Sequence, residues 1–348
     1  MSHNILITGA SGYLGGSLLA RWNQAGLPPY QKLYALVRTE EQAKAVKELY
    51  GAEPLQIDQN NESDIKQAII SRGISIIYWL ISASDTRVPK IMIDALGDVK
   101  KDTGKDVHFL FTSGAKIFSS HTGHPTDRPL LDTDPELYEF QKTLDGPQPF
   151  LKMGSKANVE VIDIAEAHGV RSYIFVPCIV YGKGEGFGNP ISIQTVAIIR
   201  AAKHMKRIYT VDDSSASWPV CHISDNSSLY LDILRAILSG QNPAHGKKGF
   251  YLASSGSVKW HDLYGAMAKT LVKRGAIHDE TLTPADDAAL EEMAKVLQGV
   301  KSYVPAELGG RCTFTAANGH AIGWKATYPP EHIFELAEEE VDLVLEHS

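Results

Sequence analysis

The chain has 348 residues, of which 43% are hydrophobic and 22% are charged, values typical of a soluble globular protein. Its formal net charge is −7 and no basic run occurs, so a nucleic-acid-binding surface is not indicated. No apolar run approaches the roughly 18 residues of a membrane-spanning helix, and no signal peptide precedes the first predicted strand. We therefore expect a cytoplasmic protein that binds neither nucleic acid nor a membrane.

Short β-rich segments alternate with helical ones from residue 4 to about residue 177. The segment 74–81 (ISIIYWLI) is nearly all apolar, as expected of a central parallel strand that is buried on both faces. The alternation predicts right-handed βαβ units and an α/β fold with a doubly wound parallel sheet of the Rossmann type. The six predicted strands are 5–7, 33–37, 54–57, 74–81, 107–112 and 173–176.

A glycine-rich turn follows the first of these strands and leads into a helical pattern. In a strand–turn–helix context, Gly9 permits the turn, Gly12 lets a pyrophosphate approach the backbone, and Gly15 lets the helix pack on the sheet. The free N–H groups of the helix then face the phosphates. An ordinary strand-to-helix turn is the alternative. We assign dinucleotide binding to the residues of this turn, which are Gly9, Ser11, Gly12, Tyr13, Leu14 and Gly15.

The spacing TGxxGxxG at residues 8–15 resembles that of the extended short-chain dehydrogenase/reductase superfamily, which includes epimerases, dehydratases and ketone reductases. Two later motifs also resemble this superfamily: residues 220–225 (VCHISD) and the Gly323-Trp324 pair. Asp225, in the first of these motifs, is otherwise interpreted as a cap of the following helix. The resemblance therefore extends over most of the chain and implies a nicotinamide cofactor.

The second strand is followed by Arg38, where NAD-specific Rossmann proteins carry an acidic residue. A guanidinium there suits the 2′-phosphate of NADP(H), through a charge-assisted contact. NADP(H) is thus the predicted cofactor and NAD(H) the less favoured one. A solvated surface arginine is the alternative interpretation.

The resemblance implies further cofactor contacts at the carboxyl ends of other strands. Asp58 and Gln59 match the positions that touch the adenine edge, although Asp58 equally suits a turn. Leu80 and Ser82 fall where the backbone passes the cofactor ribose. Pro177 and Val180, in a segment similar to RPxxVYG, would lie beneath the nicotinamide.

Catalysis in this superfamily uses a Ser or Thr after the fifth strand and then a Tyr-x-x-x-Lys motif. The serine position falls on Gly114, or on Ser113 if the register shifts by one. Lys156 matches the catalytic lysine, which orients the ribose and lowers the pKa of the tyrosine. Lys152 stands at the tyrosine position, so the usual acid is absent.

Other residues are candidates for the missing proton donor. Lys152 beside Lys156 would have its pKa lowered by like charge. Lys116 resembles the lysine in the branch containing progesterone 5β-reductase and iridoid synthase, which helps to reduce conjugated carbonyls. Tyr181 and Tyr138 are the remaining candidates. The alternative interpretation of both lysines is that they are solvated.

The segment 114–149 is rich in Pro, Gly, Asp and His, which predicts a long functional or mobile loop. We expect His121 and His124 in it to be solvated, with a role as proton shuttles as the alternative. His222 lies in an apolar strand and is expected to be a core histidine whose ring is hydrogen-bonded.

The pattern becomes irregular from about residue 178, and we predict a dinucleotide-binding domain (1–177) followed by a smaller, mixed substrate domain (178–348). Some segments of the second domain are expected to return to the sheet. The three cysteines, Cys178, Cys221 and Cys312, show no metal-ligand spacing, so no metal site is expected.

The predicted function is NADPH-dependent reduction of a small, mostly apolar carbonyl or conjugated carbonyl compound. Ser113 would hold the substrate oxygen, and one of Lys116, Lys152 or a tyrosine would supply the proton. Two alternatives stay open: a non-catalytic NADP(H) sensor similar to the NmrA-like regulators, and a nucleotide-sugar epimerase or dehydratase. The superfamily also suggests a homodimer.

Overall fold

A computed structural model describes residues 2–144 and 148–347. Its centre is a seven-stranded sheet in which every neighbouring pair of strands is parallel, so the α/β, doubly wound fold class is confirmed. The strand order is β11-β7-β5-β4-β1-β2-β3. The strands are β1 (Asn4–Ile7), β2 (Lys32–Leu36), β3 (Glu53–Leu55), β4 (Ile74–Trp79), β5 (His108–Thr112), β7 (Arg171–Pro177) and β11 (Phe250–Ala253).

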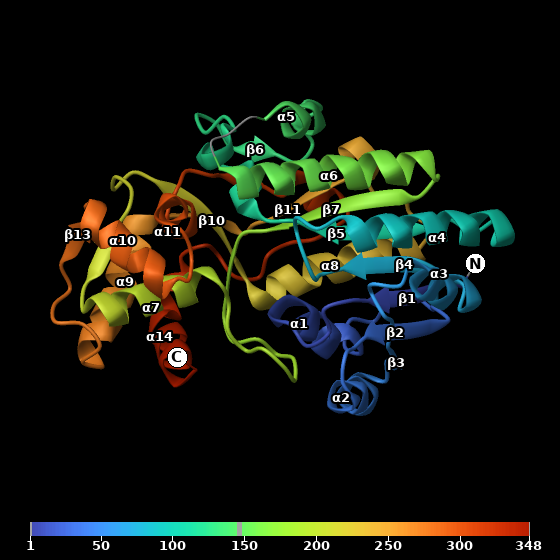
Figure 1. Cartoon of the computed structure of the whole chain (residues 1–348), viewed down its shortest axis with the longest axis horizontal. Helices are drawn as coiled ribbons and strands as arrows, with labels where there is room; N and C mark the ends of the chain where they lie inside the picture. Colours follow the sequence, from blue (N-terminus) through green and yellow to red (C-terminus); the bar gives the residue numbers. More distant parts are fainter. Residues whose placement is uncertain (1, 145–147, 348) are drawn as a thin grey trace.

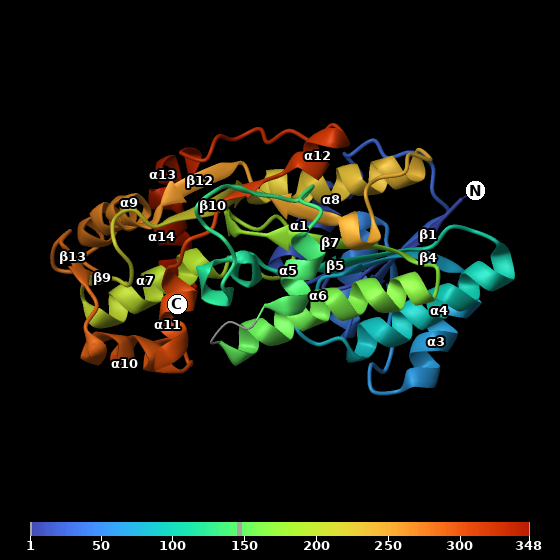
Figure 2. The same ribbon diagram turned by 90° about the horizontal axis from the view of Figure 1, so that it is seen from above.

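Helices cover both faces of this sheet (Figures 1 and 2). One layer consists of α3 (Glu62–Ser71), α4 (Arg87–Thr103) and α6 (Pro149–Ala167). The opposite layer contains α1 (Tyr13–Trp22) and α8 (Ile223–Leu238), with α2 (Glu40–Tyr50) beside α1. Since both faces are covered, every residue of β4 is buried, as the apolar sequence of that strand predicts.

Local sequence signals explain where the helices begin and end. The hydroxyl of Thr39 accepts the backbone N–H of Gln42 at the start of α2, and Gly51 ends that helix in the left-handed conformation (φ +67°). Gly104 ends α4 with the same φ of +67°. The predicted boundaries are close to the observed ones, although β3 ends at Leu55, two residues before the predicted end of that strand.

The prediction of one long loop over residues 114–149 is wrong. The segment holds η1 (Ala115–Phe118), η2 (Ser120–Thr122), β6 (Leu130–Leu131) and α5 (Leu137–Thr143), and α6 already begins at Pro149. Residues 145–147 of the predicted loop lie outside the described residues. The sequence near these short elements does not predict them, because their positions depend on distant segments. One such segment is β14 (Phe314–Thr315), which pairs with β6.

Asp132 is one of the residues that hold this segment. It is buried, and its two carboxylate oxygens accept the backbone N–H groups of Asn318 (2.8 Å) and Leu252 (3.1 Å). Asp132 thereby joins the end of β6 to β11 and to α12 (Ala317–Ala321). Burial raises the pKa of this carboxyl to about 6, although the backbone hydrogen bonds counteract the effect.

The second half of the chain forms a lobe beside the carboxyl ends of the sheet strands (Figure 1). It contains the small sheet β12-β10-β8 and the pair β13-β9. The strand β11 returns to the main sheet, and its residues pair with those of β7. The division into domains at residue 177 stays a prediction. The strands of the lobe are β8 (Ile179–Tyr181), β9 (Ile208–Thr210), β10 (Ser217–His222), β12 (Gly256–Lys259) and β13 (Leu282–Pro284).

The helices of the lobe pack around these strands. They are α7 (Gln194–Met205), α9 (Trp260–Lys273), α10 (Asp287–Val296), α11 (Val304–Leu308), α13 (His332–Glu335) and α14 (Ala337–Glu346). The single turns η3 (Gly246–Lys248) and η4 (Lys301–Tyr303) complete the described elements. In the part of the chain that the structure describes, no helix combines the length and the apolar character needed to cross a membrane.

Candidate functional site

The glycine turn between β1 and α1 is as tight as its sequence predicts. Gly9 has φ +67°, and a Cβ there would lie 2.8 Å from the carbonyl oxygen of Leu80. A Cβ on Gly15 would lie 2.3 Å from the carbonyl oxygen of Gly9, so α1 can approach the turn only because residue 15 has no side chain. Gly12 is the N-cap of α1 and offers no side-chain cap. The turn and the uncapped helix start therefore fit the diphosphate of a dinucleotide.

Arg38 is exposed and follows β2 at the same edge of the sheet. Gln42 of α2 connects it to the glycine turn: its Oε1 accepts the backbone N–H of Arg38 (2.8 Å) and its Nε2 donates to Ser11 Oγ (3.2 Å). No sequence motif marks Gln42. Its bridge places the start of α2 beside the turn, where the adenosine half of a dinucleotide lies in a Rossmann fold.

The other residues predicted to contact the cofactor lie at this edge in turn conformations. Asp58 Oδ1 accepts the backbone N–H of Asn60 (2.9 Å), which is the turn geometry that the sequence allowed. The carbonyl oxygen of Gln59 accepts a hydrogen bond from Arg87 (2.8 Å).

The two positions after β4 are held in the same way. The N–H of Leu80 donates to Thr8 Oγ1 (2.9 Å), and Ser82 Oγ accepts the backbone N–H of Asp85 (3.1 Å). The roles of Asp58, Gln59, Leu80 and Ser82 in cofactor binding stay predictions.

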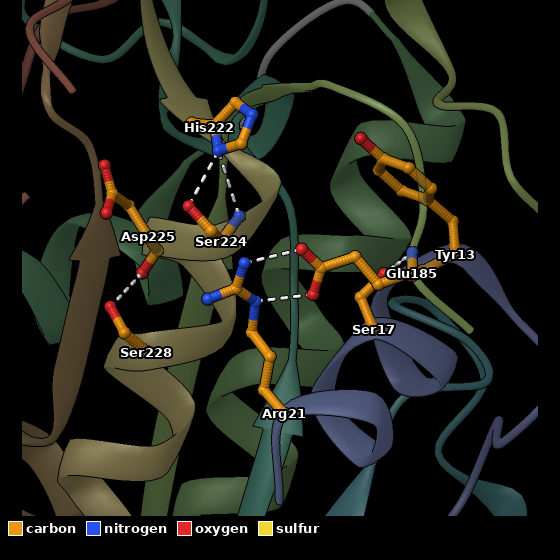
Figure 3. Close-up of polar contacts among 8 residues, drawn as sticks. All are labelled: Tyr13, Ser17, Arg21, Glu185, His222, Ser224, Asp225 and Ser228. Atoms are coloured by element: carbon orange, nitrogen blue, oxygen red, sulfur yellow. Dashed lines mark hydrogen bonds and ion pairs between the residues drawn. The ribbon is translucent and has the colours of Figure 1, made fainter. Parts of the chain in front are cut away.

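A glycine-rich segment from the second half of the chain lies against the glycine turn and α1. We call residues 182–190 the strap. Figure 3 shows Glu185 of the strap paired with Arg21 through both carboxylate oxygens (2.5 Å each), while its backbone N–H donates to Ser17 Oγ (3.0 Å). The N–H of Asn189 donates to the carbonyl oxygen of Ser11 (3.0 Å).

The first residue of the strap is held on both sides. Tyr13 Oη donates to the carbonyl oxygen of Gly182 (2.6 Å), and the N–H of Gly182 donates to Glu340 Oε1 of α14 (2.5 Å). Glu340 is buried, and burial raises the pKa of its carboxyl. The C-terminal helix therefore positions the segment that lies on the glycine turn.

A cavity of about 880 Å³ opens between the carboxyl ends of β5 and β7, the glycine turn and the lobe. Its volume is in the usual range for ligand pockets, and it lies at the carboxyl ends of the parallel strands, the edge where doubly wound sheets bind ligands. Six of the predicted site residues line it: Tyr13, Leu14, Ser113, Lys116, Pro177 and Val180.

Ser113 follows β5 and is buried at the cavity wall. Its backbone N–H donates to the carbonyl oxygen of Phe175 (2.8 Å), which fixes its position beside β7. Its Oγ has no hydrogen-bond partner among the described residues. Since a buried hydroxyl normally has a partner, this atom is suited to bind a ligand oxygen. The neighbouring Gly114 has no hydroxyl to offer.

Lys116 lies in η1, three residues beyond Ser113. Its ammonium forms an ion pair with Glu307 of α11 and lies 5.3 Å from the ring centroid of Tyr303. Burial lowers the pKa of Lys116, and the nearby carboxylate of Glu307 counteracts this. No sequence motif marks Glu307 or Tyr303, because only the packing of the lobe brings them to the cavity.

The other candidate catalytic residues do not line the cavity. Lys156 of α6 is exposed and Lys152 is half-buried, and neither is among the lining residues. Tyr138 Oη donates to Asp163 Oδ1 (2.5 Å), while Tyr181 is buried beside His222 with ring centroids 5.3 Å apart. The catalytic roles of Lys152 and Lys156 stay predictions, whereas Ser113 and Lys116 share the cavity with the glycine turn.

The two histidines of the predicted loop are not both solvated. His124 is buried, stacks on Phe118 with ring centroids 5.7 Å apart, and its Nε2 lies 2.9 Å from Gln141 Nε2. Burial lowers its pKa to about 4. His121 Nε2 lies 3.2 Å from the carbonyl oxygen of Gly309. Neither histidine lines the cavity, so proton transfer through them has no geometric support.

The interpretation of Asp225 as a helix cap is wrong. The N-cap of α8 is His222, whose ring accepts the backbone N–H of Ser224 (3.3 Å), because the helix begins one residue after β10 ends (Figure 3). The carboxylate of Asp225 instead accepts the backbone N–H of Tyr328 (3.0 Å). The indole of Trp324 donates to the carbonyl oxygen of Asp225 (3.1 Å). The two late motifs therefore contact each other and hold the end of the chain on α8.

Within residues 2–144 and 148–347, no group of three or more His, Cys, Asp or Glu side chains is arranged to hold a metal ion. The three cysteines are buried and free. Burial raises the pKa of each thiol, so none is a reactive thiolate at neutral pH.

No protein-family model and no curated protein sequence matches this chain. Solved structures do resemble it along nearly its whole length. UDP-glucose 4-epimerase from Thermotoga maritima, solved with UDP-glucose, has a TM-score of 0.61 at 13% identity, covering 98% of this chain and 99% of the epimerase. Vestitone reductase from alfalfa has a TM-score of 0.56 at 16% identity, covering 98% of both chains.

The dTDP-glucose 4,6-dehydratase from Bacillus anthracis, solved in complex with NAD, has a TM-score of 0.63 at 12% identity, covering 100% of this chain and 97% of the dehydratase. At such low identities the likeness shows a common fold, which is the fold that the sequence motifs imply.

Proposed function

We propose that this protein is an NADPH-dependent reductase of a mostly apolar carbonyl or conjugated carbonyl compound. One observation carries the proposal. One cavity is lined by the glycine-turn residues Tyr13 and Leu14 and by Pro177 at the end of β7, and its polar lining residues include Ser113 and Lys116. The proposed cofactor site therefore adjoins groups that can bind and protonate a substrate oxygen.

The residues present fit a nicotinamide dinucleotide. The tight glycine turn would hold the diphosphate at the start of α1, and Pro177 and Val180 would line the place of the nicotinamide. When bound, the reduced nicotinamide supplies the hydride that is added to the electrophilic carbon. The neighbouring structures include a reductase and an enzyme complexed with NAD, so the choice of NADPH rests on Arg38 alone.

The chain itself would supply orientation and a proton. The free Oγ of Ser113 would donate a hydrogen bond to the carbonyl oxygen and so favour the negative charge that develops there. The ammonium of Lys116 would give its proton to that oxygen, and the resulting neutral amine would be reprotonated from solvent. A lowered pKa suits this role, because an acid works best when its pKa is near the working pH.

The test is NADPH consumption against a panel of aldehydes, ketones and enones, with product analysis. Lys116→Met should lower kcat by about 10²- to 10⁴-fold, because general acid catalysis contributes that much. Its matched control is Lys269→Met, which removes an exposed lysine of α9 that does not line the cavity. Equal losses in the two variants would contradict the role of Lys116.

A non-catalytic NADP(H) sensor is the second candidate, and the position of Lys152 favours it. This lysine stands at the position of the superfamily tyrosine and does not line the cavity. No proton donor therefore replaces the tyrosine at that position. NADPH binding without turnover of any compound in the panel would support the sensor and exclude the reductase.

A further inference from the structure

The charged lining residues of the cavity and the apolar residues at its mouth indicate which class of compound it binds. Resting on the proposed reductase function, we propose that the substrate is an uncharged lipophilic carbonyl compound, with an apolar part long enough to reach from Ser113 to the cavity mouth. This goes beyond the sequence analysis, which predicts a small substrate.

The charged side chains of the cavity are paired with each other. Among the described residues that line the cavity, Lys116 and Glu307 are the ones with charged side chains, and they form an ion pair with each other. The aromatic face of Tyr303 also lies against the ammonium. A phosphate or carboxylate on the substrate would have to compete with Glu307 for Lys116 and would lie close to the carboxylate. The cavity therefore disfavours anionic compounds, including nucleotide sugars.

The mouth of the cavity carries exposed apolar side chains. Three of its lining residues are large apolar side chains that are strongly exposed: Ile193 (67%), Val300 (66%) and Phe150 (55%). They come from three separate segments, which precede α7, precede η4 and begin α6. Exposed apolar side chains gathered at one opening are typical of a site that binds an apolar ligand.

The cavity is larger than a small aldehyde would fill. Part of the 880 Å³ would hold the nicotinamide end of the cofactor, near Leu14, Pro177 and Val180. The rest is walled largely by apolar groups such as Ile117 and Leu151. A small aldehyde at Ser113 would leave this wall in contact with water, whereas a longer substrate would bury it. Each added methylene should therefore raise kcat/KM by about fourfold until the cavity is filled.

The experiment uses the full chain with NADPH and two matched series of about five to fifteen carbons: straight-chain methyl ketones, and the same ketones with a terminal carboxylate. Binding is measured separately from turnover, by displacement of the uncharged, polarity-sensitive dye Nile red. We expect the dye to bind, and the methyl ketones to displace it with affinities that rise about fourfold per methylene. The carboxylates should displace it poorly.

Two variants make the test specific. Ile193→Asp places a charge at the mouth and should weaken dye binding at least tenfold. Leu49→Asp on α2 is the matched control, since Leu49 is also a strongly exposed apolar residue (57%) but does not line the cavity. Glu307→Gln leaves Lys116 without its counter-charge, so the carboxylates should displace the dye from this variant better than from the wild type.

The outcomes separate this inference from the proposed function. Displacement that depends on chain length, without NADPH oxidation, would support the lipophilic site and contradict the reductase. Turnover of short ketones without any dependence on chain length would support the reductase and overturn the inference. Equal displacement of the dye by ketones and carboxylates would also overturn it.

Discussion

The hydroxyl of Tyr13 donates a 2.6 Å hydrogen bond to the carbonyl oxygen of Gly182, 169 residues further along the chain. Tyr13 is the first residue of α1, and Gly182 is the first residue of the strap. This contact joins the glycine turn to the second half of the chain at the proposed cofactor site. Changes in the strap are therefore expected to alter cofactor binding, although the strap belongs to a different part of the sequence.

Gly188→Ala should weaken NADPH binding and destabilise the fold. A Cβ at this position would lie 2.1 Å from the carbonyl oxygen of Ser11, so the strap or the glycine turn must move. We expect a loss of about 1–3 kcal/mol in the free energy of unfolding, as for other overpacked sites, together with a higher Kd for NADPH. Chemical denaturation and calorimetric titration would measure the two effects.

Gly265→Ala is the matched control for that variant. Gly265 lies inside α9, and a Cβ there would meet no atom within 4 Å. Alanine should therefore stabilise the protein by about 0.5–1 kcal/mol, because it favours the helix, and should leave the Kd for NADPH unchanged. Similar behaviour of the two variants would contradict the role of the strap.

Arg38→Ala should change the preference between the two nicotinamide cofactors. Loss of a charged hydrogen bond to the 2′-phosphate is worth about 1.5–3 kcal/mol, so the Kd for NADPH should rise about 10- to 150-fold. The Kd for NADH should stay nearly the same, because NADH has no such phosphate. Lys44→Ala, which removes an exposed cation from α2, controls for general attraction of anions. Tighter binding of NADH than NADPH by the wild type would contradict the assignment.

Glu307→Gln should shift the pH dependence of the reaction. The carboxylate of Glu307 raises the pKa of Lys116 while burial lowers it, so without the carboxylate the pKa must fall. If Lys116 is the proton donor, kcat/KM for reduction falls as pH rises through this pKa. The alkaline limb of the profile should therefore move to lower pH by about 1–3 units, and Glu307→Asp should largely restore it. An unchanged limb would exclude Lys116 as the donor.

Asp132 should make the stability of the fold depend on pH. Its pKa of about 6 lies above the ordinary value of 3.8, so the folded state binds the proton more tightly than the unfolded state. The stabilisation by this group is therefore complete below about pH 4 and is lost as pH rises through 6. Its size is on the order of 2–3 kcal/mol.

The measurement is the difference in unfolding free energy between the wild type and Asp132→Asn, from about pH 4 to pH 8. The difference should shrink as pH rises, because the asparagine does not titrate. His124, with a pKa lowered to about 4, is present in both proteins, so its own contribution cancels. A difference that is constant over this range would show that Asp132 has an ordinary pKa in the folded protein.

Local patterns were sufficient for the parallel sheet. The apolar run of β4 predicts a strand that is buried on both faces. The glycines at 9, 12 and 15 predict a tight turn, because a side chain at these positions would meet the neighbouring backbone. The short elements between residues 114 and 149 were not predictable in this way. Asp132, for example, is ordered by backbone groups more than 100 residues away in the chain.

The candidate site likewise contains residues that the sequence indicates and residues that it does not indicate. Ser113 and Lys116 could be selected from the sequence because the segment after the fifth predicted strand resembles catalytic segments of the superfamily. Glu307, Tyr303 and the strap could not be selected, since neither spacing nor periodicity marks them.

The amino-acid sequence by itself determined the fold class and the glycine turn, because both follow from backbone geometry and burial within a few residues. Its resemblance to the superfamily added Ser113 and Lys116 as candidates. Only the tertiary structure decided that Lys116 is paired with Glu307, that Lys152 and Lys156 do not line the cavity, and that the strap lies on the glycine turn. The physical reason is that ion pairing, cavity shape and apolar rims arise between segments whose distance in sequence carries no information about their distance in space.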